Sequence, residues 1–303
     1  MVNLCLTLSR LGSLFGGDLK TVITTAAKAE QAGVDTVVVT DHVVIGRNVE
    51  KYPYGSFTFS PEEPWPEPLT MLTAMAATTE RVRLATGILI SSCRPAVLLA
   101  KTVATLDALS GGRVDLGLGT GWQREEIEAC GAPMSGRTAR LEDTIAVCRT
   151  LWSGGPVSIE TGTVSFHDLW SYPVPVQSPL PIWLAGPPSP PVLDRIARLA
   201  EGWLPMPSHA STTELPECME RYRQALMAAG RKPEEARARV NLGVERDADG
   251  APDLGKTLEV ALPRLVAAGV THPALSLGNF ITGADGIDAF FAELGRRWPA
   301  VAS

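Results

Sequence analysis

Four short segments carry residue types that could do chemistry, and each lies in or directly after an apolar run. The runs are rich in valine, isoleucine and leucine, a composition typical of buried strands. The residues that end them include an acidic residue, a histidine, threonines and closely spaced glycines. The segments are Thr40-Asp41-His42, Thr86-Gly87-Ile88, Gly119-Thr120-Gly121-Trp122 and Ala185-Gly186.

His42 is a candidate for proton transfer, with Asp41 beside it. An imidazole can hydrogen-bond a cofactor ring or move a proton near neutral pH. It is one of four histidines in the chain, and it follows the apolar run at 34–39 closely. A structural histidine in a surface loop is the alternative.

The spacing of Gly117, Gly119 and Gly121 allows three interpretations. It is not the G-x-G-x-x-G spacing of dinucleotide-binding turns. The letters VDLGLGTG resemble the first motif of adenosylmethionine-dependent methyltransferases. That motif normally follows the first strand of its domain, and an acidic residue ends the next strand, whereas here the next strand ends in Ala185-Gly186. The glycines could also serve close packing alone.

Weaker signals come from a proline-rich turn and from aromatic residues. Residues 185–190 (AGPPSP), including Ser189, lie between a strand and a helix, where free backbone amides can hold phosphate. Three prolines remove donors there. Tyr54, Trp65 and Trp122 could stack on a flat ligand or simply pack.

Four charged residues beyond the glycine pattern are interpreted as ordinary surface groups. Glu125 and Glu126 fit first-turn charges of a helix, where they complement its dipole. Arg137 and Arg140 are expected to be solvated or salt-bridged.

The elements that position these residues are organised around the stretch 81–122. A strand over 82–90 is followed by a helix that opens after Pro95, ends at Gly111-Gly112 and leads into a strand over 114–118. Leu99, Val103 and Leu106 recur at helical spacing. A crossover helix returns the chain in the same direction, so the two strands are parallel.

The rest of the chain repeats this alternation and predicts a single (β/α)8 TIM barrel over residues 1–303. The 303 residues, 45% of them hydrophobic, suit one such barrel. A small hairpin insertion is expected at about 155–178. The further strands are expected at 2–8, 34–39, 181–185, 202–206, 237–244 and 272–277, and the further helices at 68–79, 140–152, 211–229 and 255–268, the last kinked at Pro263.

Barrel enzymes place their chemistry on the loops after the strands. The segments that follow strands two, three and four should therefore lie together on one rim. The long connection at 43–67 is rich in proline, glycine and aromatic residues and has no periodicity. A loop of this length is expected to cover a site.

Composition excludes several classes of partner. The net charge of −6 comes from interspersed residues, so nucleic acid is not expected. Five scattered cysteines without a C-x-x-C spacing disfavour zinc and disulfides and fit the cytoplasm. No apolar run is long enough for a membrane span, and no metal site is expected.

Taken together, the motifs resemble the luciferase-like monooxygenase superfamily, and in particular its branch dependent on the deazaflavin coenzyme F420. The resemblance covers most of residues 32–205, while the C-terminal third matches loosely. The matching segments are AGVDTVVVTDH at 32–42, PWPEPLTMLTAMAATTERVRLATGILI at 64–90, RPAVLLAKTVATLDALSGGRVDLGLGTGW at 94–122, RTARLEDTIAVCRTLW at 137–152, PVQSPLPIWLAG at 175–186 and LAEGWLP at 199–205.

The resemblance implies a flavin or deazaflavin across the barrel mouth. In the family, a non-prolyl cis peptide after strand three supports the ring, and the matching pair here is Gly87-Ile88. Asp41-His42 would lie near the transferred hydride, and residues 119–122 would run along the ring. The phosphate loop of the family is replaced by Ala185-Gly186-Pro187-Pro188-Ser189, which leaves phosphate contacts there open.

The resulting hypothesis is an oxidoreductase that moves a hydride between F420 and a small, largely apolar substrate under the 43–67 loop. Tyr54 and Trp65 are expected to contact this substrate, and a homodimer is expected from the resemblance. The alternative is an FMN-dependent monooxygenase. A methyltransferase and a non-catalytic flavin-binding barrel are the more distant rivals.

Overall fold

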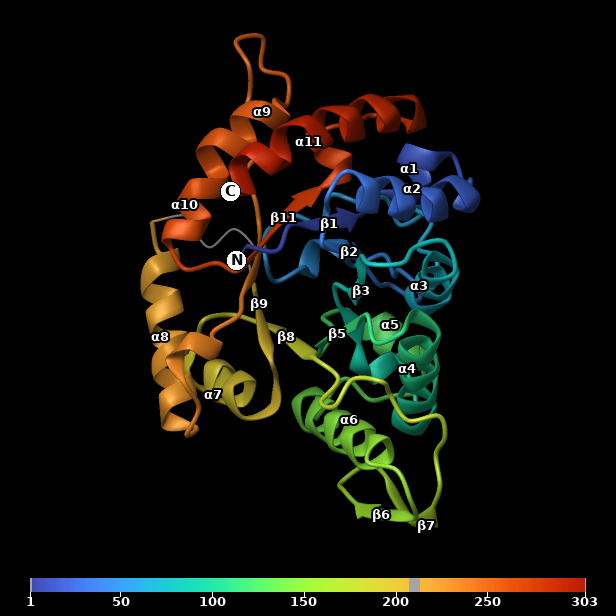
Figure 1. Cartoon of the computed structure of the whole chain (residues 1–303). Helices are drawn as coiled ribbons and strands as arrows, with labels where there is room; N and C mark the ends of the chain where they lie inside the picture. Colours follow the sequence, from blue (N-terminus) through green and yellow to red (C-terminus); the bar gives the residue numbers. More distant parts are fainter. Residues whose placement is uncertain (1, 207–212, 303) are drawn as a thin grey trace.

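The computed structural model describes residues 2–206 and 213–302 (Figure 1). Its centre is a ring of parallel strands in the order β10-β11-β1-β2-β3-β5-β8-β9. The strands are β1 (Cys5–Leu8), β2 (Thr36–Val39), β3 (Arg83–Thr86), β4 (Leu89–Ile90), β5 (Val114–Gly119), β8 (Ile182–Gly186), β9 (Gly202–Pro205), β10 (Arg239–Asn241) and β11 (His272–Ser276).

The ring closes between β9 and β10. Trp203 of β9 forms a parallel bridge with Ala238, and its amide donates to the Arg237 carbonyl at 2.9 Å. Because β3 and β4 are two pieces of one strand, the described residues form an eight-stranded barrel, and the predicted barrel is confirmed.

The third strand of the barrel is interrupted where the sequence predicts a continuous strand over 82–90. β3 ends at Thr86 and β4 begins at Leu89, and both pieces pair with β5. The peptide between Gly87 and Ile88 is cis, as the resemblance implied. The break lies at the carboxyl end of the strand, on the rim that carries the other candidate segments.

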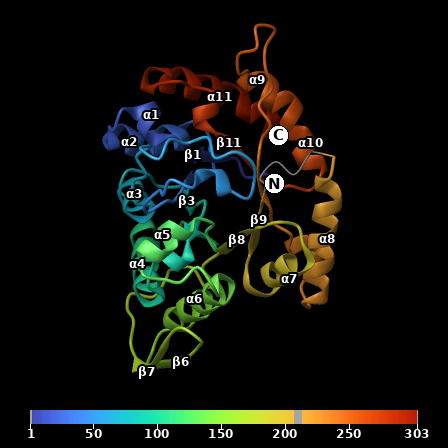
Figure 2. The ribbon, with the colours of Figure 1, turned by 180° about the vertical axis from the view of Figure 1, so that it is seen from behind.

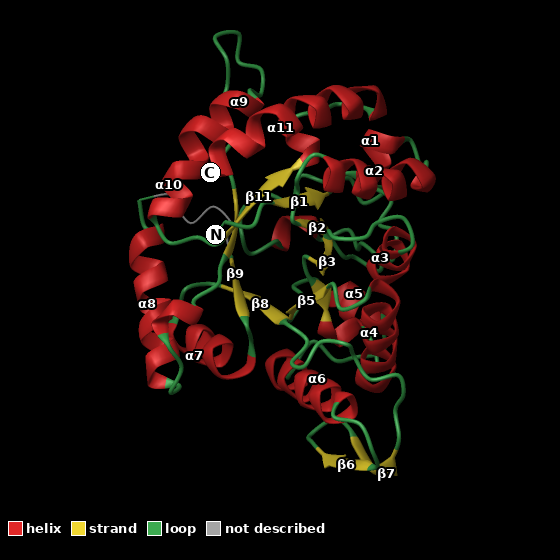
Figure 3. Cartoon of the chain, viewed as in Figure 1, coloured by secondary structure: helices red, strands yellow, loops and turns green. Residues whose placement is uncertain are grey.

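Helices cover the outside of the ring (Figure 3). Asp18 caps α2 by accepting from the Lys20 amide at 3.0 Å, and Glu67 caps α3 ahead of Pro68. The helices are α1 (Leu11–Phe15), α2 (Leu19–Gln31), α3 (Pro68–Ala76), α4 (Ala96–Ser110), α5 (Arg124–Ala129), α6 (Arg137–Trp152), α7 (Pro190–Leu199), α8 (Leu215–Ala228), α9 (Leu254–Lys256), α10 (Leu262–Ala267) and α11 (Ile287–Ala302).

The core divides into two parts because strand side chains alternate between the faces of the sheet. Leucines such as Leu6, Leu84 and Leu116 join the helices in one large buried cluster. A second cluster holds the small residues Cys5, Val38, Ala85 and Ala274, which are close neighbours in the strand pairing. The interior of the barrel is therefore filled by small side chains near this level.

The predicted hairpin insertion is present. β6 (Val157–Glu160) and β7 (Ser165–Leu169) form a separate antiparallel sheet. Figures 1 and 2 show it beyond α6, at the opposite end of the molecule from α11.

Several predicted boundaries differ from the structure. The predicted helix over 255–268 is divided by a π-helical segment, Thr257–Ala261, directly before α10, because Pro263 has no N–H to donate to the preceding turn. The predicted strand over 237–244 is limited to β10. The first residues of the predicted helix over 211–229 lie outside the described residues. The five-residue helix α1 was missed because it is too short for a periodic pattern.

Candidate functional site

A cavity of about 600 Å³ opens at the carboxyl ends of the strands. Most of the predicted site residues line it: Thr40, Asp41, His42, Tyr54, Trp65, Gly87, Ile88, Gly119, Thr120, Gly121, Trp122 and Ala185. Thr86, Gly186 and Ser189 are absent from its lining. The segments after strands two, three and four therefore meet on one rim, as the barrel arrangement predicts.

His42 is bound by a buried carboxylate that sequence reasoning missed. Its Nδ1 lies 2.9 Å from Oε2 of Glu126, a residue with no exposed surface. Oε1 of Glu126 accepts from the Val43 amide at 2.7 Å. The interpretation of Glu126 as a surface charge is wrong, because α5 turns this side chain inward toward the end of β2.

The bond to Glu126 fixes how the imidazole can act. An ionised carboxylate only accepts hydrogen bonds, so Nδ1 of His42 carries the proton in this contact. Among the described residues, the hydrogen bond of the His42 ring is made through Nδ1. Since His42 lines the cavity, Nε2 is the ring atom available to a bound molecule.

Asp41 is held by Arg94, the second residue that sequence reasoning missed. Arg94 donates from Nη1 to Oδ2 at 2.7 Å and from Nη2 to Oδ1 at 2.9 Å. The Ile90 amide also donates to Oδ2, at 2.9 Å. The Asp41 carboxylate is fully buried, so these bonds offset the cost of keeping it charged. The pair ties the end of β2 to the segment that follows β4.

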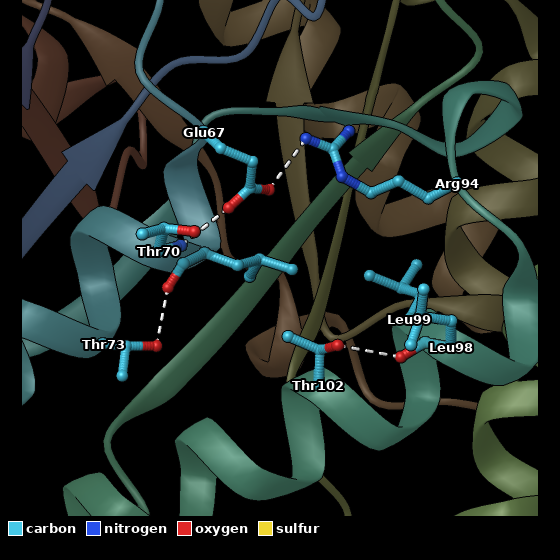
Figure 4. Close-up of a pocket in the computed structure, with 8 residues that line it drawn as sticks. Glu67, Thr70, Thr73, Arg94, Leu98, Leu99 and Thr102 are labelled. Carbon is cyan, nitrogen blue, oxygen red and sulfur yellow. Dashed lines mark hydrogen bonds and ion pairs between the residues drawn. The ribbon is translucent and has the colours of Figure 1, made fainter. Parts of the chain in front are cut away.

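Arg94 extends the network to the start of α3 (Figure 4). Its Nη2 lies 3.0 Å from Oε1 of Glu67, whose Oε2 accepts from the Thr70 amide at 2.7 Å. These contacts line a smaller hollow of about 270 Å³ between α3 and α4. The carboxylates of Asp41 and Glu67, with desolvation acting against them, raise the pKa of Arg94, which therefore stays charged.

The start of the 43–67 loop is attached to the segment after β5. The Gly46 amide donates to Gln123 Oε1 at 2.7 Å, and Gln123 Nε2 donates back to the Gly46 carbonyl at 3.2 Å. Asn48 hydrogen-bonds Glu125. Glu125 is thus a loop anchor as well as a first-turn helix charge. The loop is held over the rim by side chains at the start of α5.

Aromatic rings surround His42 on the cavity side. Its ring meets Trp65 edge-on with centroids 4.8 Å apart, and Phe57 at 5.6 Å. Tyr52 packs against Trp122 at 5.2 Å. Edge-to-face packing of this kind adds to simple area burial. The aromatic residues of the loop therefore form an apolar wall beside the histidine.

Two of the glycines are required by close approach. A Cβ on Gly117 would lie 2.1 Å from the Thr86 carbonyl oxygen, and one on Gly121, whose φ is +72°, would lie 2.6 Å from Ile90. Thr86 uses its hydroxyl to bridge the strands, donating to the Gly117 carbonyl and accepting from its amide, both at 2.8 Å. Arg137 donates to the Gly121 carbonyl. It is therefore attached to the rim and is not simply solvated.

The predicted phosphate segment after β8 uses its own polar groups internally. The Ser189 amide donates to the Pro187 carbonyl at 2.8 Å, and the Ser189 side chain makes no capping bond to α7. The Gly186 carbonyl accepts from Trp203 Nε1 at 3.0 Å. Ala185 alone of these residues lines the cavity. The role of Gly186 and Ser189 in cofactor binding stays a prediction.

Comparison with known proteins identifies the family. The model of the luciferase-like monooxygenase family matches residues 3–249. This match covers most of the chain, and the chain belongs to that family. The resemblance drawn from the motifs is thereby confirmed.

Relatives and solved structures agree with this assignment. An F420-dependent glucose-6-phosphate dehydrogenase from Kineococcus radiotolerans is 30% identical over 237 residues, which cover 77% of this chain and 66% of the dehydrogenase. The match to uncharacterised mycobacterial relatives spans about half of their length (52%).

Two solved structures share the fold, each with a TM-score of 0.78. Monooxygenase RslO1 from Streptomyces bottropensis is 22% identical and covers 98% of this chain and 97% of its own. An F420-dependent secondary alcohol dehydrogenase is 17% identical and covers 99% of each chain. At these identities the likeness concerns the fold alone. No helix among the described residues is long and apolar enough to cross a membrane.

Proposed function

We propose that this protein is an oxidoreductase that transfers a hydride between the deazaflavin coenzyme F420 and a small, largely apolar organic substrate. The observation that carries the proposal is the His42–Glu126 pair, buried beside the cis Gly87-Ile88 peptide at the barrel mouth. The name of the Kineococcus relative, an F420-dependent dehydrogenase, supports the choice of cofactor.

The cavity fits a flat ring system. Gly119 at the end of β5 packs against the Ile88 side chain and Gly121 against the Ile90 side chain, and all four residues line the cavity. The ring would lie against residues 86–88, and its side chain would continue toward residues 185–189. The residues proposed to hold the cofactor are Thr40, His42, Thr86, Gly87, Ile88, Gly119, Thr120, Gly121, Trp122, Ala185, Gly186 and Ser189. When bound, a deazaflavin supplies or accepts the hydride.

The protein's own part is to orient the substrate, exclude water and manage a proton. In the tautomer that Glu126 selects, Nε2 of His42 is the unprotonated ring nitrogen, so it accepts a proton from the substrate as the hydride leaves; with both ring nitrogens protonated, Nε2 returns that proton in the reverse direction. Asp41, which the sequence suggested as a catalytic partner, acts by fixing the end of β2 through Arg94. Tyr54 and Trp65 contribute to the apolar wall that receives the substrate.

An FMN-dependent monooxygenase is the second candidate, because the monooxygenase RslO1 shares the whole fold. Equilibrium binding of F420 and of FMN to the purified protein separates the two. We expect tight binding of F420, followed by absorbance and tryptophan fluorescence, and weak binding of FMN. The reverse order of affinities would assign the protein to the FMN branch.

The His42→Ala variant tests whether the barrel is catalytic or only binds its cofactor. We expect F420 still to bind, because the other residues proposed to hold the cofactor remain, and the rate of substrate reduction to fall by about 10²- to 10⁴-fold, the usual loss when a general acid is removed. An unchanged rate with intact binding would remove His42 from the proton-transfer role. Binding of adenosylmethionine in place of either flavin would support the methyltransferase alternative.

Three properties of the whole protein complete the proposal. We propose that the chain acts as one domain over 1–303, that it forms a homodimer, and that it acts in the cytoplasm on a small-molecule substrate. The continuous barrel supports the single domain, whereas the homodimer rests on the sequence resemblance and the cytoplasm on the scattered cysteines.

A further inference from the structure

Arg239 lies in the wall of the cavity with its hydrogen-bonding capacity unused. It is 94% buried (6% exposed), and it lines the cavity from the start of β10. None of its three guanidinium nitrogens has a hydrogen-bond partner in the part of the chain that the structure describes. The guanidinium stacks on the Trp183 ring at 4.7 Å, and Nε1 of Trp183 also lacks a partner. Buried donors without acceptors are rare and costly.

Among the described residues, the groups around Arg239 supply no counter-anion. Both carboxylate oxygens of Asp115 accept hydrogen bonds from Arg83, at 2.7 and 2.9 Å. Burial raises the pKa of the Cys5 thiol to about 11, so the thiol is neutral. Burial and the positive charge of Arg239 lower the pKa of His272 to about 3, so the imidazole is neutral as well. The positive charge of Arg239 is thus left without a bonded anion inside the barrel.

Arg239 differs from the other charged residues of the cavity. Of the charged residues in the described lining, Asp41 pairs with Arg94, and Arg10 lies over the Phe59 ring. Arg239 has neither an ion-pair nor a hydrogen-bond partner among the described residues. A buried cation in this state favours a ligand of the opposite charge.

The cavity is also divided in polarity. The side formed by β1, β10 and β11 presents Arg239 and the hydroxyls of Thr7, Ser9 and Ser276, the last two 3.0 Å apart. The loop after β2, the strand next to β1, presents the aromatic wall beside His42. A ligand that matches both sides has an apolar body and one oxyanion end.

We propose that Arg239 forms an oxyanion subsite that receives the carboxylate of the substrate. A guanidinium fork matches a carboxylate with two parallel hydrogen bonds. Because the three guanidinium nitrogens lie in the cavity wall, the side chain must turn from the Trp183 ring toward the cavity to form these two hydrogen bonds. The inference rests on the proposed hydride-transfer function, because it names the class of substrate that the same cavity takes.

Calorimetric titration with benzoate and with its neutral isostere benzamide tests the subsite. We expect the wild-type protein, with F420 added, to bind benzoate about tenfold more tightly than benzamide, the effect of one hydrogen bond to a charged group. Arg239→Met should abolish this preference and leave benzamide binding intact, which also shows that the variant is folded. Arg239→Lys should retain part of the preference as a point charge.

Arg237→Met is the matched control, because Arg237 is exposed and lies two residues away. It should keep the preference for benzoate. Equal binding of benzoate and benzamide to the wild type, or a preference that persists in Arg239→Met, would overturn the subsite.

Titration with F420 shows whether the oxyanion belongs to the substrate or to the cofactor. It also separates failure of the subsite from failure of the proposed function. Unchanged F420 affinity in Arg239→Met supports the substrate as the source. Lost F420 affinity with a retained benzoate preference would assign Arg239 to the cofactor and overturn the inference. Failure of F420 to bind the wild type would refute the proposed function, whereas bound F420 without a benzoate preference would refute the subsite alone.

Discussion

At the scale of single residues, the main finding is that the candidate histidine has a buried partner. One carboxylate oxygen of Glu126 hydrogen-bonds His42 and the other accepts from the Val43 amide, so Glu126 fixes the orientation of the ring and of the adjacent backbone. Removing the charge while keeping the shape should affect proton transfer more than folding.

We predict that Glu126→Gln lowers kcat/KM by on the order of 10²-fold. The side-chain oxygen of the new amide keeps accepting from the Val43 amide, so its NH₂ group faces Nδ1 of His42. This contact imposes the tautomer in which Nε2 carries the proton. F420 binding should change little, and the pH profile of kcat should shift. Steady-state kinetics across pH measures both. Glu128→Gln is the control, since Glu128 lies on the same helix, is exposed and pairs with the exposed Arg124. Equal kinetics for the two variants would refute the role of Glu126.

A second prediction at this scale concerns acid stability. Because the folded-state pKa of His272 is lowered to about 3, the unfolded chain takes up a proton below about pH 6.5 while the folded chain does not. The stabilisation is complete above that pH and is lost as the pH falls toward 3. Between pH 7 and pH 5, urea unfolding should show a loss about 2 kcal/mol larger for the wild type than for His272→Gln. His167→Gln, at an exposed position, should behave like the wild type.

At the scale of elements, the site is a junction of separate barrel units. The ends of β2 and β4 and the start of α3 are joined by Arg94, and the loop after β2 is joined to α5 by Gln123 and Glu126. These ties cross between units that pack side by side. The stability of the rim should therefore depend on a few buried polar groups.

We predict that Arg94→Met lowers the free energy of unfolding by about 3 kcal/mol, because it leaves the buried Asp41 carboxylate without its cation. Urea denaturation measures the change. Arg124→Met removes an exposed pair spaced four residues apart on α5 and should stay within about 0.5 kcal/mol of the wild type. A similar small effect for both variants would show that Arg94 does not hold the rim.

At the scale of the whole molecule, the barrel leaves apolar side chains exposed on its outer helices. Leu98 and Leu109 of α4 are 61% and 62% exposed. Because eleven residues make about three helical turns, the two side chains lie on the same face of α4. We predict that sedimentation velocity will give a particle of twice the 32.2 kDa chain mass, as expected for a homodimer. A single species at the mass of one chain across micromolar concentrations would refute the prediction.

The periodicity of the sequence determined the barrel and most of its elements. Strands and helices have local signatures, apolar runs and residues three to four apart, so each could be located without its neighbours. The carboxyl ends of the parallel strands meet on one rim, and this rule placed Asp41, His42, Gly87 and residues 119–122 together. Boundaries near Pro263 and the short helix α1 were missed because local patterns are weakest there.

Only the tertiary structure decided the partners of the site residues. Glu126 is 84 residues from His42, and Arg94 is 53 from Asp41. In the sequence, a glutamate in the first turn of a helix looks the same whether it faces water or a buried histidine. Likewise, Arg239 is one arginine among many until the closed barrel buries it beside Trp183. Burial and pairing depend on which strands become neighbours, and that is settled when the ring of strands closes.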